Sequence, residues 1–245
     1  NINDFGYWED DVYVFIQTQS IEQIAQQFNF SNEELMLKND FFLNKLKNHR
    51  NKNRTLPRLD DKCLTAWNAL FAIGCLECYQ AFEDEIFLNA AQKNTNTLII
   101  TMLDPESGTL YRNYKDNKIT ISGFLDDYAF LIKALIKLYQ STLQLSYLNQ
   151  AKQITDYVID HFYNENEGLF EYKNKNDEKL IATHFEIEDN VIPSSNAIMG
   201  QNLWLLSIIF ENEYYKKVSK NMCNQIIESV DYGSAFSDWL QLFLW

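Results

Sequence analysis

Apolar residues recur every three or four positions along most of the 245-residue chain, which is the spacing of helices that bury one face. The exceptions are short stretches in which apolar and polar residues alternate, a pattern typical of β-strands. Two pairs of such stretches, 110–114 with 119–121 and 169–172 with 180–182, predict small β-hairpins. The pattern therefore predicts an all-α fold with small β-hairpins in its long loops.

The helical pattern repeats along the chain. Tyr79-Gln80 matches Tyr139-Gln140, and Leu88-Asn89 matches Leu148-Asn149, at a common offset of 60 residues. A constant offset indicates stacked supersecondary units. Here each unit is a pair of helices joined by a short turn, with a long connection to the next pair. A third and more diverged copy covers 196–230.

This repeat sets the predicted domain organisation. We expect a single domain over 1–245, in which a lead-in at 1–56 is followed by hairpin repeats at 57–122, 123–192 and 193–232. Three hairpins make an incomplete ring, and an open ring leaves apolar helix faces exposed. Such exposure favours a homodimer.

The lead-in shows local signals of its own. Val12–Phe15 is a short strand candidate. Ser20 precedes an apolar helical pattern, and Ser31 is followed three residues later by Glu34, which is the capping-box pattern. We therefore expect two capped helices before the first hairpin repeat.

The first helix of each hairpin begins with polar residues after a long connection. If the hairpins pack side by side in a ring, these helices are parallel, and their N-termini converge on the face that carries the long loops. We predict a functional site on that face. The candidate substrate-binding residues are Asp60, Trp67, Asn68, Asp126, Tyr128, Ser194 and Asn196, and the candidate catalytic residues are Asp61, Asp127 and His184.

The paired aspartates, Asp60-Asp61 and Asp126-Asp127, each allow two interpretations. Aspartate is a preferred N-cap and is favoured at the positive end of a helix, so capping accounts for one aspartate of each pair. The other carboxylate is then available for chemistry, and Asp61 with Asp127 could supply the acid and the base of glycoside hydrolysis. The same carboxylates could instead accept hydrogen bonds from sugar hydroxyls.

The remaining candidates also have plainer interpretations. His184 lies among acidic loop residues that would raise its pKa and suit an acid/base role, although a solvated loop histidine explains it as well. Ser194 and Asn196 stand at an ordinary helix start, without the Gly-x-Ser-x-Gly elbow of a nucleophilic serine. Trp67 and Tyr128 could stack on a sugar ring or pack the loops.

Composition excludes several classes of function. The formal net charge of −13 disfavours nucleic acid and anionic membrane surfaces as partners. No apolar run reaches the roughly 18 residues of a membrane span. Three of the four cysteines follow helical apolar patterns, and no spacing suggests a disulfide framework, which favours a cytoplasmic location. No metal-ligand spacing and no cofactor motif is present, so we expect neither.

Three segments resemble one known family. They are Pro57-x-x-Asp60-Asp61-Lys62-x-x-x-x-Trp67-Asn68, Gly123-Phe124-x-Asp126-Asp127-Tyr128-Ala129-Phe130 and Pro193-Ser194-x-Asn196. In this order they are similar to motifs in the helical region of the YyaL-like proteins, also called spermatogenesis-associated thioredoxin-like proteins. The resemblance covers roughly residues 7–245. Family members carry a thioredoxin-like domain before this helical region.

The resemblance implies an (α/α) toroid related to six-hairpin glycosidases and N-acylglucosamine 2-epimerases, incomplete in this chain. The chain departs from the family where Ala69 and Ser195 replace glycine, and where Asp189-Asn190-Val191 replaces Asp-Gly-Ala. Two functions remain open. One is a carbohydrate-active domain, either a sugar epimerase or isomerase or a glycoside hydrolase, acting on a sugar or another small molecule. The other is a non-catalytic binding or scaffold domain that works with a thioredoxin-like domain.

Overall fold

The computed structural model describes residues 6–9, 12–14, 16–177 and 182–245. The chain forms two compact units, Asn1–Asp60 and Asp61–Trp245. The lead-in that the sequence predicts at 1–56 falls within the first of these units.

The first unit combines a small antiparallel sheet with two helices. Its strands are β1 (Gly6–Glu9) and β2 (Val12–Val14), and its helices are α1 (Ile21–Phe28) and α2 (Asn32–Asn53). Both predicted helix starts are confirmed, because the side chains of Ser20 and Ser31 cap the helices in full capping boxes. Helix α2 buries none of its residues within this unit, and it leaves apolar side chains such as Leu37 and Phe41 exposed.

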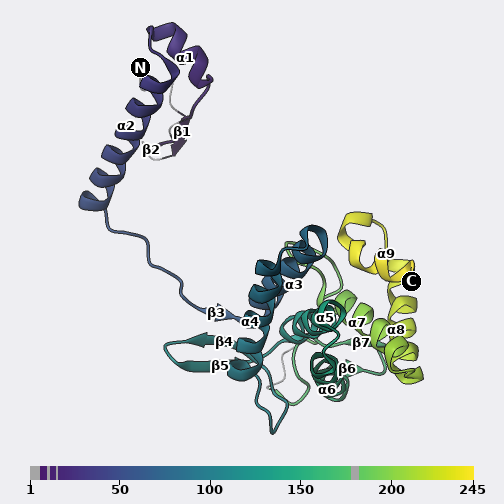
Figure 1. Ribbon diagram of the computed structural model, residues 1–245. Helices are drawn as coiled ribbons and strands as arrows, with labels where there is room; N and C mark the ends of the chain where they lie inside the picture. The colour runs from purple at the N-terminus through teal and green to yellow at the C-terminus, as the bar shows by residue number, and fades with distance from the viewer. Residues whose placement is uncertain (1–5, 10–11, 15, 178–181) are drawn as a thin grey trace. The chain divides into compact units, whose positions relative to one another are not determined.

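The second unit is built from three helical hairpins, and a short helix follows them. Helices α3, α5 and α7 are the inner helices: α5 packs against α3 on one side and α7 on the other (Figure 1). Each inner helix also packs against the helix that follows it. The hairpins are α3 (Thr65–Phe82) with α4 (Glu85–Met102), α5 (Leu125–Thr142) with α6 (Leu145–Phe162) and α7 (Ser195–Ile209) with α8 (Glu213–Ile226), and the last helix is α9 (Ser237–Phe243).

The tight turns of the first two hairpins have the same geometry. Glu83 and Leu143, which are 60 residues apart, both adopt left-handed backbone conformations with φ of 55° and 56°. Each N–H then bonds back to the carbonyl of a tyrosine four residues earlier, Tyr79 and Tyr139, at 2.8 and 2.7 Å. The structure thus confirms that the sequence repeat is a repeat of helical hairpins.

The long loop after α4 contains the predicted hairpin. Strands β4 (Tyr111–Lys115) and β5 (Lys118–Ser122) pair antiparallel, and their two-residue turn, Asp116-Asn117, has positive φ at both positions. That geometry suits the twist of the strands. A short strand, β3 (Cys63–Leu64), adds to the free edge of β4.

The first strand of the second predicted hairpin has a local partner. Strand β7 (Leu169–Phe170) pairs with β6 (Tyr163–Asn164), which follows α6 directly. The sequence predicts 180–182 as its partner. Ala182 is in a bend, and 180–181 lie outside the described residues. The local partner is favoured because a four-residue connection closes at a smaller cost in chain entropy than a longer loop.

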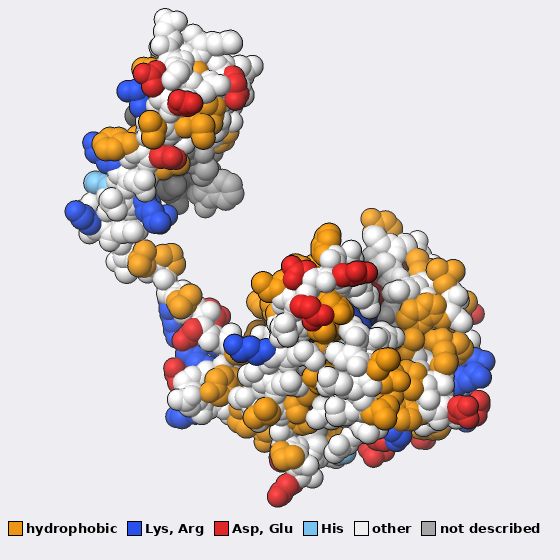
Figure 2. Space-filling view, viewed as in Figure 1, with side chains coloured by type: hydrophobic (Ala, Val, Ile, Leu, Met, Phe, Trp, Pro, Cys, Tyr) orange, Lys and Arg blue, Asp and Glu red, His pale blue; other side chains and the backbone are white. Residues whose placement is uncertain are grey.

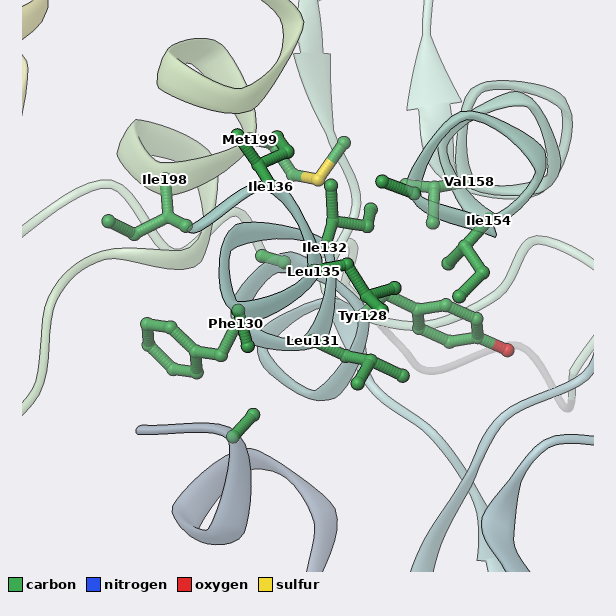
Figure 3. Packing of buried hydrophobic residues seen from close by; sticks show 14 of the residues in the cluster. Tyr128, Phe130, Leu131, Ile132, Leu135, Ile136, Ile154, Val158, Ile198 and Met199 are labelled. Carbon is green, nitrogen blue, oxygen red and sulfur yellow. The ribbon is translucent and has the colours of Figure 1, made fainter. Parts of the chain in front are cut away.

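Helix α5 lies at the centre of the core and is buried on nearly all sides. Figure 3 shows side chains from α5 pointing outward in every direction, toward Ile154 and Val158 on one side and Ile198 and Met199 on another. A helix surrounded by neighbours is apolar around its whole circumference. Its polar first turn, which contains Asp126 and Asp127, departs from this pattern, and the candidate functional site lies there.

Candidate functional site

The carboxylate of Asp127 joins the starts of two inner helices. Its Oδ1 accepts a hydrogen bond from the backbone N–H of Ala66 in α3, with N at 2.9 Å. Its Oδ2 accepts from the backbone N–H of Phe124, the N-cap of its own helix, at 3.0 Å. The side chain is completely buried. Asp127 therefore satisfies donors that two helix N-termini would otherwise leave unpaired.

Arg112 of strand β4 forms ion pairs with both aspartates of the pair. One guanidinium nitrogen, Nη1, lies 2.9 Å from Asp126 Oδ1 and 2.8 Å from Asp127 Oδ2. The guanidinium also lies over the ring of Phe124, at 4.9 Å from its centroid. The long loop thus returns to α5 and supplies the cation that two buried carboxylates need.

The cluster raises the pKa values of both Asp127 and Arg112, for different reasons. Burial, and then the neighbouring charge of Asp126, raise the pKa of Asp127 to about 7, although Arg112 and the two N–H donors act to lower it. Burial alone would lower the pKa of Arg112, but the two carboxylates outweigh it and raise that pKa above its ordinary value. Arg112 is therefore a permanent cation, while Asp127 can exchange a proton near neutral pH.

Tyr128 and Asn68, predicted to bind substrate, are committed to contacts within the fold. The ring of Tyr128 is buried against Tyr157 and Phe162, and its hydroxyl accepts a hydrogen bond from the N–H of Leu110 at 2.9 Å. Asn68 donates to the carbonyl of Leu64 at 2.8 Å and so fastens β3 to α3.

Ser194 and Asn196 also hold the fold together. Ser194 is the N-cap of α7, as expected for a helix start. Asn196 makes a two-way pair with the backbone of Phe170, accepting from its N–H at 2.8 Å and donating to its carbonyl at 2.9 Å. Both side chains are fully buried. Between them lies Ser195, whose buried hydroxyl has no hydrogen-bond partner.

The structure corrects the predicted role of Asp60-Asp61 as a helix start. Helix α3 begins only at Thr65, after strand β3, and its N-cap Leu64 makes no side-chain cap. Asp61 instead forms an ion pair with Lys115 of β4, with 49% of its side chain exposed. Asp60 is exposed and ends the other compact unit. Trp67 is 64% exposed on α3.

A cavity of about 740 Å³ lies beside the N-terminus of α5. Phe124 and Tyr172 contribute tilted rings 5.1 Å apart, and Tyr172 bonds through its N–H to the carbonyl of His184. His184, which the sequence singled out, thus lines this cavity together with Glu171. Its other lining residues are Lys173, Asn174, Lys175, Asp177, Ala182 and Thr183.

Sequence reasoning missed the residues that complete this site. The sequence places Arg112 and Glu171 only in alternating segments, and Tyr172 among the loop tyrosines expected on the site face. Their inward positions depend on how each loop folds back onto α5. The sequence gives one indication of these positions. Polar and apolar residues alternate along each predicted strand, and every second residue of a strand lies on the same face. Among the described residues, no group of three potential ligands could hold a metal ion, and no helix is long and apolar enough to cross a membrane.

Parallel inner helices, each followed by an outer helix, define the (α/α) toroid class. Solved structures share this fold. A family 76 α-mannanase from Bacteroides thetaiotaomicron matches 78% of this chain and 54% of its own, with a TM-score of 0.61 and 15% identity. The cellobiose 2-epimerase of Bacillus thermoamylovorans matches 69% of this chain and 45% of its own, with a TM-score of 0.55 and 10% identity. A D-mannose isomerase matches 67% and 42%, with a TM-score of 0.53 and 15% identity.

Sequence comparison confirms the predicted resemblance. The chain is 33% identical over 178 residues, 69% of its length, to an uncharacterised protein of Caenorhabditis elegans. It is 28% identical over 193 residues, 75% of its length, to human spermatogenesis-associated protein 20. No family model matches. The chain is thus a homologue of spermatogenesis-associated protein 20 over most of its length, and it spans 24% of the length of each of these two relatives.

Proposed function

We propose that this domain binds a sugar in the cavity beside the N-terminus of α5. The observation that carries the proposal is the composition of that cavity, in which the rings of Phe124 and Tyr172 stand next to the polar side chains of Glu171 and His184. Its volume of about 740 Å³ is within the range of small-molecule sites.

The chemistry of the lining suits a sugar. The C–H faces of a sugar ring are apolar and pack on aromatic rings, while its hydroxyls need hydrogen-bond partners. Glu171 can accept from hydroxyls, Asn174 can both donate and accept, and His184 can do either according to its tautomer. The fold supports the same substrate class, since mannanase, epimerase and isomerase structures share it.

The geometry favours binding over glycoside hydrolysis at the predicted pair Asp61 and Asp127. A hydrolytic acid and base must both reach the glycosidic bond. Asp127 is completely buried, and both of its oxygens accept hydrogen bonds from the protein. Its role in our proposal is to position the start of α5. His184 remains the candidate acid/base group for an epimerase or isomerase, and the scaffold function beside a thioredoxin-like domain remains the alternative.

Thermal-shift and calorimetric titration with a panel of mono- and disaccharides test the proposal. A saccharide present at about 100 times its Kd should stabilise the domain by about 2.7 kcal/mol. Tyr172→Ala and Glu171→Ala should each abolish the response. The matched control is Glu106→Ala, in an exposed turn outside the cavity. A folded wild-type domain that responds to no saccharide contradicts the proposal.

A saccharide that binds can then be used to distinguish a catalytic function from the scaffold function. Product formation is followed by NMR, which detects inversion at one carbon, conversion of an aldose to a ketose, or cleavage of a disaccharide. Loss of turnover in His184→Ala with binding retained would assign catalysis to that residue. Binding with no product at any of these bonds would favour the scaffold function.

A further inference from the structure

Two lysines of α5 lie in a charged cluster among the inner helices. Lys133 and Lys137 are one helical turn apart and therefore share a face of α5. Lys137 forms an ion pair with Glu77 of α3. The Nζ of Lys133 donates to Gln201 Oε1 of α7 at 3.1 Å and lies 4.0 Å from Asp238 Oδ1 of α9. Four helices thus contribute to one cluster. None of the contacts described for the candidate site involves it.

The cluster is accessible from solvent. The side chain of Lys133 is 22% exposed and that of Asp238 is 18% exposed. Figure 2 shows acidic side chains gathered on this side of the unit, between the regions of α3 and α9, around a hollow in which a basic side chain is visible. A small molecule can therefore approach an amine that is largely shielded from water.

The surroundings of Lys133 favour its neutral form. Burial lowers the pKa of Lys133, and the positive charge of Lys137 lowers it further, although Asp238, Glu77 and Asp189 act in the opposite direction. Burial raises the pKa of Asp238, which Asp189 raises further. The pKa values of this amine and this carboxyl group, 4.0 Å apart, thus move toward each other, which lowers the cost of passing a proton between them.

Other uses of this cluster fit less well. An anionic ligand would meet the three carboxylates of Glu77, Asp189 and Asp238 around two lysines. A metal ion is disfavoured because the described residues contain no group of three potential ligands. A neutral electrophile is not repelled by the carboxylates and needs no set of metal ligands. A desolvated lysine beside a second cation is a recognised form of activated nucleophile.

We propose that Lys133 is a nucleophilic amine that condenses with the carbonyl group of a small aldehyde or ketone, such as an open-chain sugar. The lone pair of neutral Nζ attacks the carbonyl carbon, and the carbonyl oxygen takes a proton from Asp238 to give a carbinolamine. The nitrogen then loses its two protons, one restoring Asp238 and the other passing through Asp238 to the hydroxyl, which leaves as water. One amine and one carbonyl compound thus give one imine and one water. This step does not depend on sugar binding in the cavity beside α5.

Reductive trapping tests the proposal. The whole chain is incubated at pH 7 with D-glyceraldehyde and cyanoborohydride, and the rate of modification at each lysine is measured by peptide mass spectrometry. Lys133 should be modified faster than Lys152, because a lowered pKa raises the neutral fraction of the amine at pH 7. Lys152 is the matched control because it is more exposed, at 39%, and pairs with Asp156. Equal or slower modification of Lys133 overturns the proposal.

A variant and a pH profile test whether the lowered pKa of Lys133 causes its faster modification. Lys137→Met removes a positive charge, so the pKa of Lys133 should rise and its modification rate at pH 7 should fall several-fold, with little change above about pH 10. Circular dichroism confirms that the variant is folded. In the wild-type chain, the rate at Lys133 should reach its plateau at a lower pH than the rate at Lys152. Coincident profiles for the two lysines would also overturn the proposal.

Discussion

Asp127 of α5 accepts a hydrogen bond from the backbone N–H of Ala66, the second residue of α3, across a distance of 2.9 Å. This one carboxylate ties the first turns of two adjacent inner helices together, although the residues are 61 positions apart. Because the contact is buried and charged, its loss leaves donors from both helices without a partner.

Asp127→Ala should lower the free energy of unfolding by about 3–5 kcal/mol, the usual cost of removing one partner from a buried ion pair. The N–H groups of Ala66 and Phe124 lose their acceptor together, and Arg112 keeps only Asp126. Urea unfolding followed by circular dichroism measures the change. Asp61→Ala is the control, because its half-exposed ion pair with Lys115 is screened by solvent and its loss should change stability far less. Equal losses in the two variants would show that Asp127 does not have this structural role.

Stability should depend on pH through Asp127. Its pKa is raised to about 7 in the folded domain, against about 3.9 in an unfolded chain. Between these values the native state binds the proton more tightly, so this group's contribution to stability is full below about pH 4 and is lost as the pH rises to about 7. The slope approaches 1.4 kcal/mol per pH unit for a single group.

Urea unfolding of the wild-type domain and of Asp127→Asn at several pH values isolates this contribution. The asparagine variant should lack the decrease between about pH 4 and pH 7 that the wild type shows. If the two proteins give parallel profiles over this range, the proton is not held by Asp127 in the native state.

Two glycines should respond in opposite ways to alanine. In α3, a Cβ at Gly74 would meet no atom within 4 Å, so Gly74→Ala should stabilise the domain by about 0.5–1 kcal/mol. A Cβ at Gly123 would come within 2.8 Å of the backbone carbonyl oxygen of Leu110, so Gly123→Ala should destabilise it. Thermal unfolding of both variants provides the comparison. Destabilisation by Gly74→Ala would indicate that another chain packs closely against this part of α3.

The predicted homodimer can be tested on the same face of α3. Trp67, Phe71 and Phe82 are 64%, 56% and 71% exposed, at intervals that place them along one side of the helix with Gly74. If this side forms a dimer interface, light scattering coupled to gel filtration should give a dimer for the wild type and a monomer for Phe71→Glu. A monomeric wild type at micromolar concentration would contradict the prediction.

Local patterns were enough to predict most of the architecture. Tyr79 and Tyr139 share a position in the repeat because each lies one turn before the same kind of left-handed turn. Ser20 and Ser31 cap their helices through contacts three residues away. Features of this range are encoded in short stretches of sequence, so periodicity and capping chemistry predict them.

The site was predicted less completely, and the reason is visible at particular residues. The sequence placed Asp127, Asp126 and Phe124 at the start of an inner helix, and that placement is correct. The same reasoning placed Asp61 at an equivalent position, but β3 separates Asp61 from α3 because Cys63 and Leu64 pair with the edge of β4. Pairing between strands some 50 residues apart leaves no local trace.

What the sequence determined by itself is the repeat, the three helical hairpins and the polar turns at which α5 and α7 begin. Only the tertiary structure decided which polar groups face one another. It placed Arg112 against Asp126 and Asp127, closed a cavity with Tyr172 and His184, and set Lys133 beside Asp238. Each of these contacts joins side chains from separate elements. The burial and the neighbouring charges that shift the pKa values of these side chains exist only once the helices have packed.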